Sequence, residues 1–116
     1  MTLETIRAAH ARIAPYIVQT PLLRLPALDD ALGCEVYAKA ECMQRTGAFK
    51  LRGAYNKIRS LTKEEADRGV IACSAGNHAQ GIALSATKLG IKSIICMPAG
   101  APISKVEATK NYGAEV

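Results

Sequence analysis

The chain has 116 residues, 49% of them hydrophobic and 22% charged, a balance typical of a folded domain and not of a disordered segment. There are 15 basic and 10 acidic residues, giving a formal net charge of +5. The basic residues are scattered and aromatic residues make up only 4%, which argues against a nucleic-acid-binding surface. Mild basicity fits a site for phosphate or carboxylate anions equally well.

The cysteines and the N-terminus point to a cytoplasmic protein with reduced thiols. None of the 4 cysteines forms a C-x-x-C pair, so neither a zinc site nor a redox motif is predicted, and we expect no bound metal. Cys73 and Cys96 lie inside apolar runs, where a free cysteine behaves as a small hydrophobe. The N-terminus has no signal-peptide pattern, and no apolar stretch reaches membrane-spanning length, so we expect no membrane partner.

The first half of the chain predicts helices and extended segments on either side of a glycine-containing turn at Thr46-Gly47. In chain order we predict a helix capped by Thr2 and stopped by Pro15, an extended stretch over 16–24, a short helix over 26–33, a strand over 35–39 and a helix over 50–60.

The second half predicts strands that alternate with helices. In chain order we predict a helix opened by a Thr62–Glu65 capping box, a strand over 70–73, a loop over 74–77, a helix to Leu89, a strand over 91–97, a helix over 102–113 and the start of a strand at 115–116. This alternation is typical of a doubly wound α/β fold, an open, parallel, twisted sheet with flanking helices. Because the sequence stops two residues into a strand, we expect the N-terminal part of a longer protein.

The loop from Ser74 to His78 lies between a predicted strand and a predicted helix, where ligands bind in parallel α/β units. Its small residues expose backbone N–H groups, and the helix adds its positive N-terminal end, which suits a carboxylate or phosphate. Asn77 adds an amide that can donate and accept hydrogen bonds. An ordinary turn in which Asn77 caps the helix explains the same residues.

Lys50 lies where the glycine-containing turn becomes a helix. A lysine becomes a nucleophile when it is desolvated or close to positive charge, and Phe49 and Arg52 could supply these two conditions. A solvent-exposed lysine before a helix is the ordinary alternative, and spacing alone favours it.

Two stretches, Gln44-Arg-Thr-Gly-Ala-Phe-Lys-Leu-Arg-Gly-Ala-Tyr55 and Ser74-Ala-Gly-Asn-His-Ala-Gln-Gly81, closely resemble the two signatures of the threonine dehydratase (threonine ammonia-lyase) family. This family belongs to the fold-type II pyridoxal phosphate (PLP) enzymes and has serine racemase as a near relative. The resemblance also includes Thr20-Pro-Leu22 and Ala101-Pro-Ile-Ser-Lys105, so it runs through the whole chain. Two long motifs in the right order and separation are specific.

The resemblance implies a role for each residue of the two motifs. Lys50 would be the catalytic lysine that forms a Schiff base with PLP, Phe49 would pack near the cofactor ring, and Asn77 would hydrogen-bond its 3′-hydroxyl. The substrate carboxylate would be held, largely through backbone N–H groups, by Ser74, Ala75, Gly76, Asn77 and His78.

The implied activity is PLP-dependent β-elimination of L-threonine or L-serine to a 2-oxo acid and ammonia, in which Lys50 removes the Cα proton and the cofactor takes up the electrons. Serine racemases carry a second serine at the position of Ala75, which favours a dehydratase over a racemase-like enzyme. Ala48 stands where the family usually has serine, and the lost hydroxyl could loosen the turn.

In the family the lysine segment belongs to the larger domain and the asparagine loop to the smaller one, which implies domains over 1–62 and 69–116. Members with Gln-Arg-Thr before the glycine look nucleotide-activated, so Arg45, Thr46 and Gln80 could contact an AMP-type effector. The full-length protein would be a homo-oligomer. The family's phosphate-binding loop would lie beyond this sequence, so the isolated chain is expected to be inactive. A non-catalytic fragment, or a module that pairs with another subunit, is the alternative.

Overall fold

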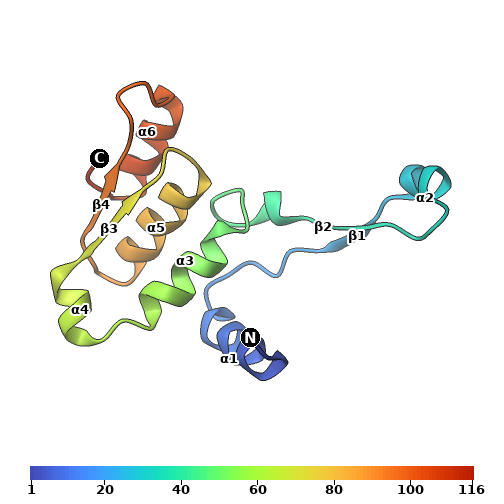
Figure 1. The fold of residues 1–116 in the computed structure, drawn as a ribbon, viewed down its shortest axis with the longest axis horizontal. Helices are drawn as coiled ribbons and strands as arrows, with labels where there is room; N and C mark the ends of the chain where they lie inside the picture. Colours follow the sequence, from blue (N-terminus) through green and yellow to red (C-terminus); the bar gives the residue numbers. More distant parts are fainter.

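The computed structural model describes residues 1–116 as a body of helices and a sheet from which a hairpin arm projects (Figure 1). The arm makes the molecule elongated, with principal extents of 51 × 38 × 22 Å. In chain order the elements are α1 (Leu3–Ile13), β1 (Leu22–Arg24), α2 (Pro26–Leu32), β2 (Tyr37–Lys39), a short 3-10 helix (Glu41–Met43), α3 (Lys50–Arg59), α4 (Lys63–Arg68), β3 (Val70–Cys73), α5 (Asn77–Lys88), β4 (Ser93–Cys96) and α6 (Ile103–Asn111).

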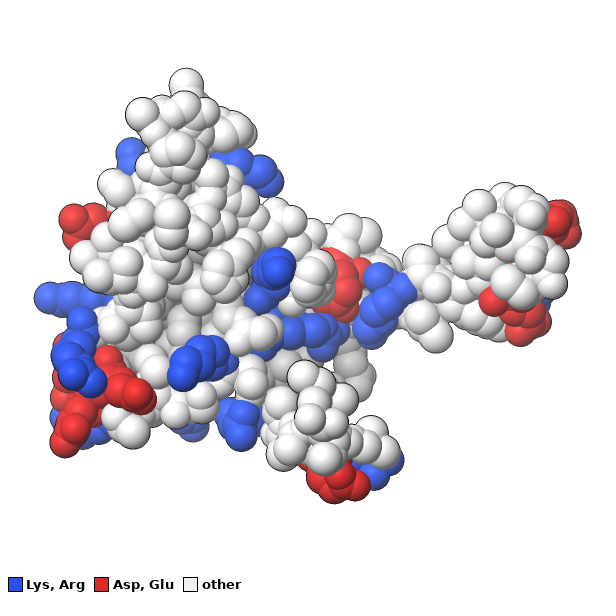
Figure 2. Space-filling view, in the orientation of Figure 1, with Lys and Arg blue, Asp and Glu red and all other residues white.

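The arm is an antiparallel pair of β1 and β2, with Leu22 opposite Lys39 and Arg24 opposite Tyr37. The sequence predicted extended segments here but not their pairing. At the tip, α2 ends at Gly33, whose φ of 65° is the left-handed conformation common at the C-terminal end of a helix. Figure 2 shows the arm as a separate lobe with acidic side chains at its tip.

A parallel sheet lies at the other end of the molecule and confirms the predicted α/β class. β3 pairs with β4 in parallel, with Val70 opposite Ser93 and Cys73 opposite Cys96. Glu115 adds a parallel bridge to Ile94, so the last residues start the further strand that the sequence predicted. α5 connects β3 to β4, as expected for a βαβ unit.

The two faces of this sheet differ in burial. Ile95 is 1% exposed and packs towards α5. The alternate residues of both strands point away from α5 and are exposed; they are Ile71, Cys73, Ile94 and Cys96. The prediction that Cys73 and Cys96 behave as buried small hydrophobes is therefore wrong for this chain, because strand alternation turns both to the uncovered face.

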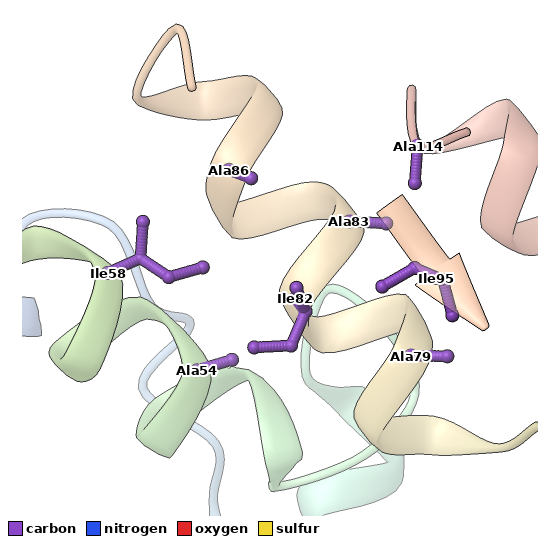
Figure 3. Packing of buried hydrophobic residues seen from close by; sticks show 8 residues of the cluster. All are labelled: Ala54, Ile58, Ala79, Ile82, Ala83, Ala86, Ile95 and Ala114. Atoms are coloured by element: carbon purple, nitrogen blue, oxygen red, sulfur yellow. The ribbon is translucent and has the colours of Figure 1, made fainter. Parts of the chain in front are cut away.

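The main core lies on both sides of α5 (Figure 3). Ile82 points from α5 towards α3, whereas Ala79 and Ala83 face Ile95 of β4 on the opposite side. The remaining buried residues of this cluster are Ala54, Ile58, Ala86 and Ala114. Because so many of these side chains are alanine, α5 can lie close to both α3 and the sheet.

A second, smaller cluster attaches α1 to α3. It consists of Ile13, Tyr16, Leu51 and Tyr55. The rings of Tyr16 and Tyr55 are stacked, with centroids 4.4 Å apart, an arrangement that adds to the energy of burial alone. Leu51, Tyr55 and Ile58 are all buried and form the apolar face of α3.

The predicted helix ends are confirmed where the sequence carries a cap. The Thr2 hydroxyl accepts a hydrogen bond from the Thr5 N–H, and the Thr62 hydroxyl accepts one from the Glu65 N–H. Gly113 follows α6 with a φ of 92°. None of the helices is long and apolar enough to cross a membrane.

The strand predicted over 70–73 is confirmed, whereas those predicted over 35–39 and 91–97 are longer than the observed β2 and β4, because backbone groups at their ends bond elsewhere. The Val36 N–H donates to Asp29 Oδ1 at 2.6 Å, so β2 begins only at Tyr37. The Ile91 N–H donates to the Ala86 carbonyl at 2.9 Å and so closes the end of α5 instead of extending β4.

Candidate functional site

Lys50 is the first residue of α3 and follows a tight turn. The Gly47 N–H donates to the Gln44 carbonyl at 2.7 Å, and Gly47 has a φ of 68°, which only glycine adopts readily. Lys50 itself is exposed, and its Nζ lies 5.1 Å from the centroid of the Phe49 ring. Phe49 is 58% exposed. The idea that Phe49 desolvates this lysine is therefore wrong for this chain, since both side chains reach solvent.

Arg52 is not a free positive charge beside Lys50, because Glu41 holds its guanidinium. Arg52 Nε and Nη2 donate to the Glu41 carboxylate at 2.8 and 2.7 Å, and the Thr20 hydroxyl donates to the same carboxylate at 2.6 Å. The hydrogen bonds from Arg52, helped by Thr20 and Lys39, lower the pKa of Glu41 to about 2 against the opposing effect of burial. The Arg52–Glu41 ion pair therefore supports the turn, and the positive charge of Arg52 is neutralised by the carboxylate of Glu41.

Gln44 fixes the other side of the turn through its amide. Gln44 is 3% exposed, and its amide bonds to both backbone groups of Val18, as the backbone of a neighbouring β-strand would. Its Oε1 accepts from the Val18 N–H at 2.9 Å, and its Nε2 donates to the Val18 carbonyl at 2.9 Å. Sequence reasoning missed this role and that of Glu41. The sequence did offer one indication: the side chain of Gln44 can both donate and accept a hydrogen bond, and no role in binding the cofactor or substrate had been assigned to it.

The asparagine loop follows the carboxyl end of β3, as predicted. The Ser74 N–H donates to the Cys96 carbonyl at 3.1 Å, and the Gly76 N–H donates to Ser74 Oγ at 3.3 Å. α5 starts at Asn77, and the capping position is Gly76, with no side-chain cap. The interpretation of Asn77 as an ordinary cap is therefore wrong, and the amide of Asn77 makes no hydrogen bond within the protein.

This loop presents unpaired donors to solvent. The backbone N–H groups of Ala75, Asn77 and His78 have no acceptor within the protein. Such groups at the first turn of α5 are the donors that bind anions at helix N-termini.

The start of α3 and the start of α5 border one cavity of about 290 Å³. It is lined by Phe49, Lys50, Arg52, Gly53, Ala54 and His78. Of the predicted site residues, the structure thus brings together Phe49, Lys50 and His78, and it places Ser74, Ala75, Gly76 and Asn77 outside the lining. A cavity of about 270 Å³ at the opposite ends of β3 and β4 contains none of the predicted residues.

Of the two Lys and Arg residues that line the cavity, Lys50 is unpaired and Arg52 is paired with Glu41. α3 carries basic but no acidic residues, namely Lys50, Arg52, Lys57 and Arg59. Figure 2 shows Lys and Arg side chains gathered over this middle part of the molecule.

The three residues predicted to contact a nucleotide are not joined by any hydrogen bond. Arg45 Nε donates to the Tyr16 carbonyl at 2.6 Å, and its guanidinium lies 4.8 Å from the Tyr16 ring centroid. Thr46 is buried, and its hydroxyl lies 3.5 Å from the Ala48 carbonyl. The turn itself is closed by the Gly47 N–H, which donates to the Gln44 carbonyl at 2.7 Å, with alanine at position 48. Gln80 is buried on α5, and its amide makes no hydrogen bond within the protein.

Comparison with known proteins identifies the family and agrees with the fold. Residues 13–116 match the family described as "Pyridoxal-phosphate dependent enzyme". The chain is 49% identical over 116 residues to the L-threonine ammonia-lyase of Thermotoga maritima, covering 100% of this chain and 29% of that protein. The structure of maize serine racemase matches 97% of this chain and 34% of its own, at a TM-score of 0.92 and 45% identity. The structure of the T.th. threonine deaminase matches 100% of this chain and 36% of its own, at a TM-score of 0.88 and 45% identity.

These matches, together with the parallel α/β sheet, place the chain in the fold-type II class of α/β enzymes. The chain belongs to the pyridoxal-phosphate-dependent enzyme family. It spans about a third of the length of the relatives it matches.

Proposed function

We propose that this chain forms the N-terminal part of an enzyme that catalyses β-elimination of L-threonine or L-serine to a 2-oxo acid and ammonia. The observation that carries the proposal is the meeting of Lys50 and His78 at one cavity, because it joins the two halves of the predicted site. The names of the relatives, a threonine ammonia-lyase and a threonine deaminase among them, support this class of reaction.

The residues present fit the cofactor of the family. Lys50 Nζ is exposed at the cavity and donates no hydrogen bond to the protein, so it is free to hold the cofactor covalently. Phe49 offers an exposed ring beside it, and the unpaired amide of Asn77 is free to bond to the 3′-hydroxyl. Bound PLP supplies an electron sink for the negative charge that develops at the substrate Cα.

The chain's own residues would then divide the remaining work. The unpaired N–H groups of the Ser74–His78 loop would bind the substrate carboxylate and so orient the Cα–H bond. The amine of Lys50 would accept the Cα proton as a general base. Ala75 carries no ionisable group, so position 75 offers no second base for the opposite face of the substrate, and this favours elimination over racemisation.

The same proposal covers the organisation of the whole protein. Residues 1–62 would belong to the larger domain and 69–116 to the smaller one, in a cytoplasmic homo-oligomer. A second candidate is a non-catalytic module that pairs with another subunit. The exposed outer face of β3 and β4, which carries Ile71 and Ile94, favours that candidate.

The test is product formation by the longest in-frame protein that contains this chain. With L-threonine or L-serine it is expected to release 2-oxo acid and ammonia together, at a rate that falls at least about a thousandfold in Lys50→Ala. Lys57→Ala is the matched control, since Lys57 is exposed on the same helix and does not line the cavity. Equal rates in wild type and Lys50→Ala would contradict the proposal. D-serine as the main product would support the racemase-like alternative.

A further inference from the structure

Gly81 lies where α5 crosses the first turn of α3, directly against the backbone of the lysine. A Cβ added at Gly81 would lie 3.3 Å from the Leu51 nitrogen and 3.3 Å from both the carbonyl carbon and oxygen of Lys50. These distances are tighter than nine in ten Cβ contacts in proteins. The neighbouring atoms belong to the backbone, so no side chain can rotate away to make room.

The helix conformation alone does not favour glycine at this position. Gly81 lies inside α5 and has no positive φ, so alanine would strengthen the helix if space allowed. Gly53 provides the comparison, because it lies inside α3 and a Cβ there would meet nothing within 4 Å. The close approach of two backbones is therefore the reason that position 81 lacks a side chain.

The contact links the two motifs of the site across the core. Gly81 is one turn beyond His78, which lines the cavity together with Lys50. Within α5, the Ser85 hydroxyl donates to the Gly81 carbonyl at 2.6 Å, on the C-terminal side of Gly81. A shift of α5 at Gly81 therefore moves the start of α5 relative to the lysine turn.

We propose that Gly81 is a positioning residue: by lacking a side chain it sets the distance between the Lys50 turn and the Ser74–His78 loop. The inference rests on the proposed function, because it concerns where the lysine stands relative to the loop that would bind the same cofactor and substrate. Alanine at this position forces α3 and α5 apart and misplaces Lys50 without changing any group that carries chemistry.

The test compares variants of the longest in-frame protein that contains this chain. Each is incubated with pyridoxal 5′-phosphate, reduced with borohydride and mapped by peptide analysis, to give the ratio of label on Lys50 to label on the other lysines. Gly81→Ala is expected to lower this ratio about tenfold or more relative to wild type. Gly53→Ala tests alanine in a helix interior where space exists, and it is expected to raise the unfolding temperature.

Ala86→Val is the control for general destabilisation. Ala86 is fully buried on the same helix, so a larger side chain there also overpacks the core, but it lies beyond Gly81 on the side away from the loop. At an equal fall in unfolding temperature, Ala86→Val is expected to keep the Lys50 ratio that Gly81→Ala loses. Equal losses in both variants, or an unchanged ratio in Gly81→Ala, would overturn the inference.

A cofactor-free measurement separates this inference from the proposed function. In wild type, a nuclear Overhauser cross-peak is expected between a Gly81 Hα and the Leu51 amide proton, and its absence would overturn the inference. A wild-type protein that shows this cross-peak, loses it in Gly81→Ala and yet labels no lysine selectively would support the packing contact and contradict the proposed function.

Discussion

The carboxylate of Glu41 accepts hydrogen bonds from both Nε and Nη2 of Arg52, at 2.8 and 2.7 Å. The pair joins the short 3-10 helix before the lysine turn to the first turn of α3 after it. A bidentate pair fixes orientation as well as distance. The two ends of the segment that carries Lys50 are therefore held together by the Arg52–Glu41 ion pair, whose side chains are mostly buried.

This pair predicts how stability depends on pH. The pKa of Glu41 is lowered to about 2 in the folded chain, from 4.5 for the free side chain. The stabilisation is therefore complete above pH 4.5 and is lost as the pH falls towards 2. Chemical unfolding of wild type and Glu41→Gln across this range is expected to give curves that converge in acid. A constant difference between the two curves would contradict the assignment.

At neutral pH, Glu41→Gln is expected to lower the free energy of unfolding by about 1–3 kcal/mol, because a charged acceptor is lost and the Arg52 guanidinium is left without its partner. Glu107→Gln is the control. Glu107 pairs with Lys110 at 3.2 Å on the exposed face of α6, where the loss is expected to be below about 1 kcal/mol.

Gln44→Leu tests the amide that pairs with the backbone of Val18. The substitution keeps the volume but removes both hydrogen bonds, so the free energy of unfolding is expected to fall by about 1–3 kcal/mol. Gln19→Leu, at an exposed position close by, is expected to change it by less than about 0.5 kcal/mol. Equal effects of the two substitutions in urea unfolding would show that the Gln44 amide does not hold this segment.

Asn77→Ala separates ligand binding from helix capping. Because the Asn77 amide makes no hydrogen bond in the protein, the unfolding free energy is expected to change by less than about 0.5 kcal/mol. The affinity for pyridoxal 5′-phosphate, followed by absorption, is expected to weaken about tenfold through loss of one hydrogen bond. Asn111→Ala, at the exposed end of α6, is the control. A large loss of stability with unchanged affinity would restore the capping interpretation.

An AMP-type effector is tested by thermal unfolding of the longest in-frame protein. A ligand that binds the folded state raises the midpoint of unfolding, so AMP is expected to raise it and adenosine, which lacks the phosphate, is not. Arg45→Gln is expected to reduce the effect, whereas Arg59→Gln, on the exposed side of α3, is expected to leave it unchanged. An unfolding midpoint that does not change when AMP is added would contradict the proposal of an AMP-type effector.

Local signals in the sequence were sufficient for most of the elements. Threonine caps at Thr2 and Thr62 and glycines at Gly33 and Gly113 act within one helical turn, so their effect does not depend on the rest of the fold. The parallel pairing of β3 and β4 followed from the alternation of strands and helices.

The contacts that assemble the site could not be predicted in the same way. The Gln44 amide meets Val18, and Gly81 meets Lys50, across 26 and about 30 residues of chain respectively. Such contacts depend on how the helices and strands pack together, and they produce no repeating pattern in the sequence from which they could be predicted. For the same reason the sequence could not show that Arg52 is paired with Glu41, whereas the exposure of Lys50 agrees with the interpretation that spacing alone favoured.

Mapping where pyridoxal 5′-phosphate attaches to the longest in-frame protein that contains this chain is the most direct measurement of the central claim. The protein is mixed with the cofactor, its visible spectrum is recorded, and the complex is reduced with borohydride before peptide mapping. The account predicts a visible band and a label on Lys50 alone, both absent in Lys50→Arg. A label spread over many exposed lysines, and unchanged in that variant, would contradict it.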